Sequence, residues 1–312
     1  MFEIFKNHLE IIGTLETVTA LRISAGRSTE PIGSDLPVIK DALGRPLIPG
    51  SSLKGALRSR LESFLRGIHL DFAANPAQEL EWSITPDEMA NVKEGIKNLN
   101  PQEKEAKLHE YIINNTDLVS SLFGSPWLAS KFQIRDLTVS EPEENWFGQY
   151  QERDGVAIDR DTETAGDGKL YDFQVVPAGT PFIFHAVIEN AEEWELGMLM
   201  IGLHQFQTEQ IPLGGGRSRG LGVVKLIIEK MNWVDVRDEN YKQDKNYKPQ
   251  TDPEKVKNYL KALIDSNSNP TSPYIDAQPL KKAWADTFIN HLSSELHKRT
   301  NTTATSSHQN HA

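Results

Sequence analysis

The chain has 312 residues, of which 38% are hydrophobic and 25% charged, so it can form one large or two small domains with part of the chain outside the core. The absence of cysteine excludes disulfides, cysteine-ligated zinc, iron–sulfur clusters and thiol nucleophiles. Because the sequence contains neither an apolar run of about 18 residues nor a signal-peptide pattern at its N-terminus, we expect a cytoplasmic protein without a membrane span.

The net charge is −11, which taken alone argues against nucleic-acid binding, because phosphate contacts need Lys and Arg side chains. The charge is unevenly distributed along the chain, however. Residues 22–66 contain eight basic and four acidic residues, whereas the acidic excess lies mainly in 76–118 and 141–195. Since binding depends on local potential, a basic surface on this acidic protein is compatible with the composition.

The first part of the chain predicts a strand, a loop, a helix and an insertion. Residues 8–24 alternate loosely between apolar and polar types, which is typical of a strand. Residues 25–50 are rich in Gly and Pro and indicate a loop. Residues 51–68 predict an amphipathic helix, with the two serines that open it as candidate N-caps. The polar, helix-prone stretch 70–118 predicts a helical insertion.

The second part predicts four strands, one helix and a polar hairpin or flexible loop. The strands are expected at 132–139, 171–176, 182–188 and 223–230, the hairpin at 153–170 and the helix at 192–207. The order of the predicted elements is βαβββαβ, and collapsing the hairpin reduces it to βαββαβ. We therefore predict an α+β fold with a ferredoxin-like, or RRM-like, core.

The composition changes after about residue 233. We expect residues 1–232 to form the main domain. Polar segments near 252–265 and 277–298 predict a helical extension over 233–298. Residues 299–312 are of low complexity and predict a disordered tail.

A first motif, GRPLIPGSSLKGALR at residues 44–58, leads from a Gly/Pro loop into the start of a helix. Free backbone amides and the helix dipole favour an anion at such a place. Lys54 and Arg58 are one helical turn apart, so both could reach the same phosphate path. The alternative interpretation is a capped surface helix with solvated charges.

A second motif, LGGGRSRGLG at residues 213–222, combines three consecutive glycines with Arg217 and Arg219. Glycines allow a backbone to approach a ligand closely. The motif is neither a P-loop nor a dinucleotide fingerprint, because no Gly-Lys-Ser/Thr follows and the loop is expected to run from helix to strand. The alternative interpretation is a flexible turn.

Four motifs in order give the sequence a family resemblance over roughly residues 10–230. They are PVIKDALGRPLIPGSSLKGALRSRLE, then LFGSP with the strand KFQIRDLTV, then GVAIDRDTETAGDGKLYDFQVVPAGTPF, and last the glycine-rich loop. Together they resemble the RAMP-superfamily backbone subunits of type III CRISPR effector complexes, of the Csm or Cmr kind or of subtype III-D.

The resemblance implies a subunit that binds a guide RNA (crRNA) and a target RNA and assembles with other subunits of the complex. The segment Asp159–Leu170 matches the family's thumb, a hairpin that wedges into the guide–target duplex. The residues implied to hold RNA are Arg22, Ser51, Ser52, Lys54, Arg58, Gly214, Gly215, Gly216, Arg217 and Arg219.

Asp35 matches the position of the family's cleavage residue, which implies target-RNA endonuclease activity with Mg²⁺ or another divalent cation. From the residues alone, Asp35 beside Gly33 and Pro37 is typical of a turn, and its catalytic role rests on the resemblance. The sequence also departs from the family, because Arg22 stands where a His is common. An arginine can hold a phosphate but cannot act as a general base.

Three alternatives stay open at this point. The chain could be a non-catalytic structural subunit of the same complex. It could be a guide-RNA-processing endoribonuclease of the same superfamily, although those enzymes commonly use a His, and neither the loop after the first strand nor the glycine-rich loop contains one. A general single-strand RNA-binding module is the third, but its strands would be expected to display stacking aromatics.

Overall fold

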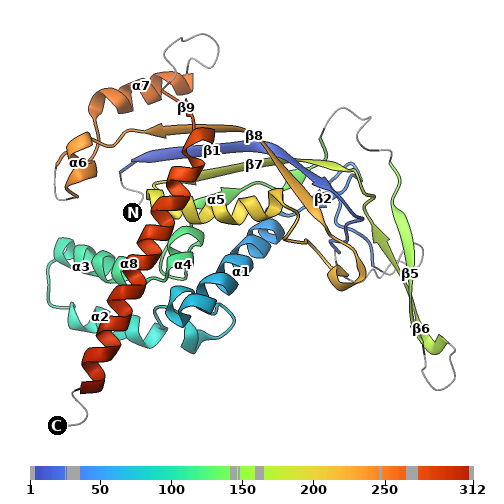
Figure 1. Cartoon of the computed structure of the whole chain (residues 1–312), viewed down its shortest axis with the longest axis horizontal. Helices are drawn as coiled ribbons and strands as arrows, with labels where there is room; N and C mark the ends of the chain where they lie inside the picture. Colours follow the sequence, from blue (N-terminus) through green and yellow to red (C-terminus); the bar gives the residue numbers. More distant parts are fainter. Residues whose placement is uncertain are drawn as a thin grey trace.

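The computed structural model describes residues 4–24, 26, 36–140, 146, 148–158, 165–245, 248–264 and 273–308, and only the backbone at 156–158, 165–171 and 300–308. A five-stranded antiparallel sheet organises the molecule (Figure 1). Its strands, in spatial order, are β3 (Phe132–Ile134), β7 (Pro181–Glu189), β1 (Asn7–Thr17), β8 (Val224–Asp235) and β9 (Ile275–Asp276). The predicted α+β class is confirmed. None of the described helices is long and apolar enough to cross a membrane.

Strand β1 is the centre of the sheet, paired with β7 on one side and β8 on the other. Its residues alternate between buried and partly exposed, and Leu9, Ile11 and Leu15 on the buried side have no exposed surface. The strand predicted over 8–24 ends early, at Thr17. The hydrogen-bond ladder between β1 and β8 stops there because the backbone N–H groups of Val18 and Thr19 both donate to the carbonyl of Val223.

Helices cover one face of the sheet (Figure 1). They are α1 (Gly50–Ile68), α4 (Leu118–Phe123) and α5 (Glu193–Gln207), and α8 (Lys281–His308) packs against α5 as a further layer. At Gly197 of α5, a Cβ atom would lie 2.0 Å from the carbonyl oxygen of Trp284 in α8. This approach is closer than any side chain permits, so a glycine is needed for α8 to dock.

The start of α1 differs from the sequence prediction. Its N-cap is Pro49, not one of the serines at 51–52, and no side chain of the cap residue bonds the helix. Instead, the carboxylate of Asp136 accepts a hydrogen bond from the backbone N–H of Gly50 at 2.8 Å. A residue distant in sequence thus satisfies the first amide of α1, and the predicted serine caps are wrong.

The stretch predicted as a helical insertion does form helices. It contains the short turns η1 (Leu70–Phe72) and η2 (Glu79–Glu81), followed by α2 (Pro86–Gly95) and α3 (Pro101–Asn115). Local capping explains where α2 begins, since Thr85 and Glu88 form a reciprocal capping box ahead of a proline at the first turn.

The polar segment predicted as a hairpin forms the antiparallel pair β5 (Gln151–Ile158) and β6 (Ala165–Val175), which projects from one end of the sheet (Figure 1). Residues 159–164 of the expected thumb lie outside the described residues. The single strand predicted over 132–139 is divided, because β3 pairs with β7 whereas β4 (Leu137–Thr138) pairs with β2 (Leu47–Ile48).

The C-terminal region contains α6 (Glu239–Gln243), α7 (Pro253–Ile264), η5 (Gln278–Leu280) and α8. Tyr259 of α7 stacks on Phe5 with ring centroids 4.6 Å apart, which attaches α7 to the N-terminal end of the chain. The backbone of α8 continues to His308, into the stretch expected to be disordered. The domain boundaries at 232 and 298 stay predictions.

A buried ion pair joins Lys131, the residue before β3, to Glu195 of α5. The ammonium of Lys131 lies 2.6 Å from both carboxylate oxygens of Glu195, and the two side chains are 7% and 2% exposed. Glu195 also accepts the backbone N–H of Glu192 at the start of α5. Burial raises the pKa of the Glu195 carboxyl, and the charge of Lys131 opposes that rise. The carboxylate therefore depends on its lysine.

We predict that Lys131→Met lowers the free energy of unfolding by about 3–5 kcal/mol, because it leaves a buried carboxylate without its partner. Urea denaturation followed by circular dichroism measures the change. The double variant Lys131→Met/Glu195→Met should recover much of the loss, since it removes both charges. Lys257→Met serves as control, because its pair with Glu254 is exposed and worth at most about 1 kcal/mol. A Lys131→Met variant as stable as this control would contradict the prediction.

Candidate nucleic-acid interface

Three chain segments meet in one hydrogen-bonded layer at the end of the sheet from which the hairpin projects (Figure 1). The chain after β1 pairs with the end of β6, since Leu21 and Val176 exchange backbone hydrogen bonds of 2.9 and 2.8 Å. The next segment continues the layer, as the N–H of Ile39 donates to the carbonyl of Ile23 at 2.9 Å. Loops are thus held by backbone bonds to a rigid sheet, a frequent arrangement at binding sites.

The glycine-rich loop lies directly on this layer. The N–H of Gly215 donates to the carbonyl oxygen of Arg22 at 2.8 Å. Gly214 has φ +73°, and a Cβ atom there would lie 2.0 Å from the same oxygen. Internal packing therefore explains the glycine at 214. Gly215 is exposed, and a Cβ atom there would have no neighbour nearer than 3.9 Å, so its missing side chain leaves open surface.

Arg22 is fixed over an aromatic ring. Its guanidinium carbon lies 4.6 Å from the centroid of Phe173 in β6. Phe173 is only 7% exposed and belongs to a small apolar cluster. The other members of the cluster are Ala20, Leu36, Val175 and Leu221. A positive charge is thus held at the base of the hairpin, beside the glycine-rich loop.

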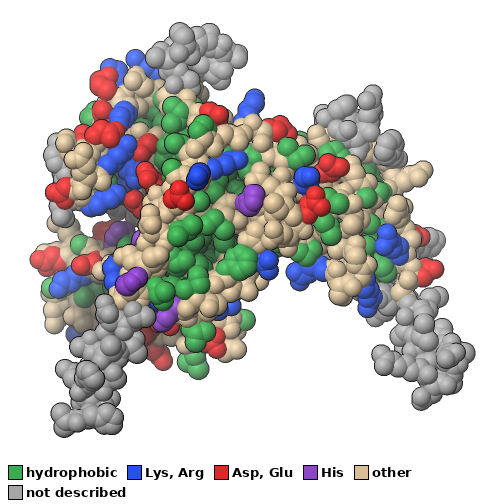
Figure 2. Space-filling model, viewed as in Figure 1, with side chains coloured by type: hydrophobic (Ala, Val, Ile, Leu, Met, Phe, Trp, Pro, Cys, Tyr) green, Lys and Arg blue, Asp and Glu red, His purple; other side chains and the backbone are tan. Residues whose placement is uncertain are grey.

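Arg217 and Arg219 form the short turn η4 (Arg217–Arg219), bounded by Gly216 and Gly220 in left-handed conformation. Both arginines are exposed. Figure 2 shows Lys and Arg side chains around the loop that precedes β8. With Arg22 they bring three guanidinium groups to one loop assembly, which makes a local positive region on a protein of net charge −11.

The chain that follows Asp35 is anchored to β6 and to Tyr150, the residue before β5. Asp35 itself lies outside the described residues. Leu36 comes next, and it donates to the carbonyl of Asp172 at 3.2 Å and accepts from the N–H of Gln174 at 3.1 Å, both in β6. On the β5 side, the hydroxyl of Tyr150 donates to the carbonyl of Gly44 at 2.6 Å. Burial and the charge of Asp41 raise the pKa of Tyr150 to about 12, so this donor keeps its proton.

Asp41 has a structural role in that segment. One carboxylate oxygen accepts the N–H groups of Leu43 and Arg45 at 2.9 Å, and the other accepts Nε of Arg45, also at 2.9 Å. Burial would raise the pKa of Asp41, but the hydrogen bonds and charge of Arg45 outweigh it and lower the pKa overall. Asp41 is therefore a turn residue whose oxygens are already engaged.

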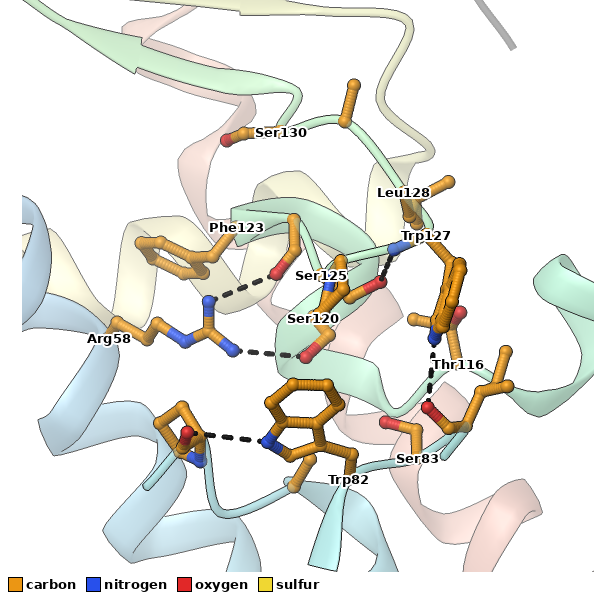
Figure 3. Close-up of a pocket in the computed structure, with 16 residues that line it drawn as sticks. Arg58, Trp82, Ser83, Thr116, Ser120, Phe123, Ser125, Trp127, Leu128 and Ser130 are labelled. Atoms are coloured by element: carbon orange, nitrogen blue, oxygen red, sulfur yellow. Dashed lines mark hydrogen bonds between the residues drawn. The ribbon is translucent and has the colours of Figure 1, made fainter. Parts of the chain in front are cut away.

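Lys54 and Arg58 point toward another part of the molecule. The ammonium of Lys54 donates to Ser130 Oγ at 2.7 Å and to the carbonyl of Phe132 at 2.9 Å, and burial lowers its pKa. Arg58 donates to the carbonyl of Gly124 at 3.0 Å, as Figure 3 shows. Ser51 is exposed and Ser52 half-buried in the first turn of α1.

The structure thus brings together only some of the residues that the family resemblance implies to hold RNA. Arg22, Gly214, Gly215, Gly216, Arg217 and Arg219 form one assembly, whereas Lys54 and Arg58 contact residues 120–132. Their RNA contacts stay predictions. Sequence reasoning missed Phe173 and Leu36. The alternation of YDFQVV could have indicated an inward-facing Phe173, but nothing in the sequence pairs it with Arg22.

The residues that the structure describes contain no group of three or more His, Asp or Glu side chains that could hold a metal ion. Asp35 is not among those residues. No ligand set for the expected divalent cation is therefore assigned.

Comparison with known proteins identifies the same family that the sequence motifs resemble. The model of the RAMP superfamily matches residues 14–225, more than half of the chain. Two relatives are named CRISPR system Cms endoribonuclease Csm3. The one from Enterococcus italicus is 27% identical over 231 residues, which cover 72% of this chain and 92% of that protein. The one from Methanocaldococcus jannaschii is 27% identical over 271 residues, which cover 83% and 94%.

A third protein of the same name, from Mycobacterium tuberculosis, is 51% identical over 55 residues, which cover 17% of this chain and 23% of that protein. This match is local and concerns a short stretch. The two longer matches span nearly the full length of the relatives.

We predict that replacing Arg22, Arg217 and Arg219 by Ala weakens binding of single-stranded RNA and makes it less sensitive to salt. Each single-strand phosphate contact contributes about 0.7 units to the slope of log K against log salt, so the slope should fall by about two units. Fluorescence anisotropy at several salt concentrations measures both quantities.

The matched control replaces three exposed lysines of α7 and α8 by Ala, namely Lys257, Lys261 and Lys282. It changes the net charge by the same amount far from the loop assembly. Equal slopes for the two triple variants would mean that the arginines do not contact RNA.

Proposed function

The chain belongs to the RAMP superfamily, and from this premise we propose that it is a guide-RNA-binding backbone subunit of a type III CRISPR effector complex that cleaves target RNA. The ferredoxin-like core of this proposal consists of β1, α1, β3, β7, α5 and β8 in chain order, with β3, β7, β1 and β8 adjacent in the sheet. The names of the two Csm3 relatives support both the complex and the reaction.

The observation that carries the proposal is the assembly of Arg22, the glycine-rich loop and the hairpin base. Guanidinium groups bind phosphates through paired N–H donors, and an exposed Gly215 lets an RNA backbone approach. Such contacts do not depend on base identity. This suits a subunit whose sequence recognition is left to pairing between guide and target. The β5–β6 hairpin beside these residues is the proposed wedge in the duplex.

The proposed cleavage uses the ribose of the target RNA as nucleophile. The 2′-oxygen attacks the adjacent phosphorus while the bond to the 5′-oxygen of the next nucleotide breaks, which leaves a 2′,3′-cyclic phosphate and a 5′-hydroxyl. Asp35, directly or through a bound water, takes the proton of the 2′-hydroxyl, and water protonates the leaving oxygen. A nucleotide displaced from the duplex by the hairpin can adopt the in-line geometry that this attack requires.

A divalent cation would supply charge neutralisation at the phosphate. The described residues offer no ligand cluster for it, so no step is routed through a metal. Measuring cleavage with and without a chelator decides whether a divalent cation is needed.

The second candidate is a non-catalytic structural subunit of the same complex. The specific observation in its favour is Arg22, a guanidinium where the family commonly has a His. Its guanidinium lies over the ring of Phe173. It cannot accept the proton of a 2′-hydroxyl.

We predict that Asp35→Asn leaves assembly and RNA binding intact but reduces target cleavage at least about 100-fold, because loss of a group that assists proton transfer usually costs that much or more. The measurement is single-turnover cleavage of a guide-complementary RNA by the assembled complex, with Mg²⁺ and with chelator. We expect the upstream cleavage product to end in a 2′,3′-cyclic phosphate.

Asp41→Asn is the matched control, since its carboxylate oxygens serve the turn and not a ligand. It should retain cleavage. If wild-type complex assembles on guide and target RNA yet does not cut, the structural-subunit function replaces the nuclease function. Cleavage by Asp35→Asn at the wild-type rate would instead refute the role of this one residue. Failure to copurify with any small RNA would refute both functions.

A further inference from the structure

A pocket of about 380 Å³ lies between the helical insertion and the LFGSP segment, apart from the loop assembly described above (Figure 3). Apolar side chains form most of its wall, chiefly Trp82, Ile84, Phe123, Trp127 and Leu128. Arg58 and several hydroxyl groups provide the polar part. Its volume falls in the range of small-molecule sites, about 300–1,000 Å³.

Two tryptophan rings are held in fixed positions in its wall. Nε1 of Trp127 donates to the carbonyl of Ile84 at 2.9 Å, and Nε1 of Trp82 donates to the carbonyl of Pro76 at 3.3 Å. The ammonium of Lys93 lies 5.4 Å from the Trp127 ring, although Lys93 does not line the pocket. Because the ring N–H groups are satisfied, both rings offer the pocket only flat apolar surface. Such surface suits stacking on another ring.

The polar part of the pocket is rich in donors. Arg58 uses three of its five N–H groups within the described residues, on Glu62, on the Gly124 carbonyl and on Ser120 Oγ at 2.8, 3.0 and 3.1 Å. Two N–H groups remain for a ligand. The Ser125 hydroxyl accepts the backbone N–H of Trp127 at 3.2 Å, which leaves its proton available. An occupant should therefore present acceptors.

Positive charge exceeds negative charge around this pocket. Arg58 lines it, Lys54 bonds the lining residue Ser130 at 2.7 Å, and Lys93 sits against Trp127. Two carboxylates oppose these cations: Glu62 pairs with Arg58, and Asp117 accepts from Ser83. The pocket thus has a local positive excess in a chain of net charge −11, which favours an anionic occupant.

A second hollow of about 630 Å³ adjoins the first, and the two share Ala74, Trp82 and Ser83. Arg66 and Arg299 line this neighbour. Asp71, Glu81 and Asp117 line it as well, so this second hollow has no positive excess, and we expect the charged portion of a ligand at Arg58 in the first hollow.

We propose that this pocket binds a nucleotide, with the base stacked on the tryptophans and its acceptors or phosphate on Arg58. Flat walls, spare donors and positive potential are together the chemistry of a nucleotide site. The nucleotide can be a free mononucleotide or one residue of a single RNA strand. The proposal does not depend on cleavage at Asp35 or on the glycine-rich loop.

Isothermal titration calorimetry of the full chain tests the proposal with AMP, UMP and a short single-stranded RNA as probes. Ribose 5-phosphate and N-acetyltryptophan are the comparison ligands, because the first lacks a base and the second is an aromatic carboxylate. We expect a nucleotide probe to bind saturably and at least 10-fold more tightly than either. Binding of AMP or UMP would identify a free nucleotide, and binding of the RNA alone would identify a strand.

Ala129→Trp blocks the pocket from an exposed position without removing any side-chain hydrogen bond. This variant should abolish nucleotide binding. It should also remove any part of the RNA binding that takes place in the pocket. Ala283→Trp is the matched control on α8, where the alanine is also exposed, and should bind as wild type. Trp127→Phe keeps a ring but removes the indole, and should weaken binding by about 5- to 100-fold, within the range expected for reduced base stacking.

Three outcomes would overturn the proposal. The first is no saturable binding of any nucleotide probe up to millimolar concentration. The second is equal binding by Ala129→Trp and Ala283→Trp, which would place the nucleotide elsewhere. The third is equal affinity for N-acetyltryptophan, which would indicate a partner's aromatic and acidic side chains as the occupant. Circular dichroism melting confirms that each variant is folded.

Discussion

The contact between the glycine-rich loop and the carbonyl of Arg22 is the constraint on which the candidate interface depends. A Cβ atom at Gly214 would lie 2.0 Å from that oxygen, so no other residue fits without moving one of the two segments. The contact joins the chain that leaves β1 to the loop that enters β8. It therefore places Arg22 next to Arg217 and Arg219, although their positions in the sequence are far apart. Phe173 then fixes the direction of the Arg22 side chain.

Strand β1 transmits this constraint to the rest of the fold. It is flanked by β7 and β8, and its residues Leu9, Ile11 and Leu15 are buried, so the loops at its end are held by a well-packed sheet. The hairpin base is attached to the same end through Leu21 and Leu36. A rigid sheet with loops grouped at one end is a common means of presenting binding residues in a fixed geometry.

Local sequence patterns predicted the elements whose signals are local. The helix at Glu193–Gln207, the strand at Pro181–Glu189 and the helical insertion follow from apolar periodicity and helix-starting residues. These patterns failed to predict contacts that are made by residues distant in the sequence. Asp136 and not a serine satisfies the first amide of α1, and the partners of Lys54 and Arg58 come from residues 120–132. Side-chain direction in such cases depends on tertiary contacts that no spacing rule contains.

The directions of Lys54 and Arg58 also change how the basic stretch between residues 22 and 66 is understood. The composition of this stretch is compatible with a basic surface, and the structure places its cations in separate groups. Arg22 joins the glycine-rich loop, whereas Arg58 and Arg66 pair with Glu62. Lys54 donates to Ser130 and to the carbonyl of Phe132. Because the chain as a whole has a net charge of −11, each group of cations is at most a local positive region. Under the proposed function, RNA would contact the protein at these grouped cations, which makes a net charge of −11 compatible with RNA binding.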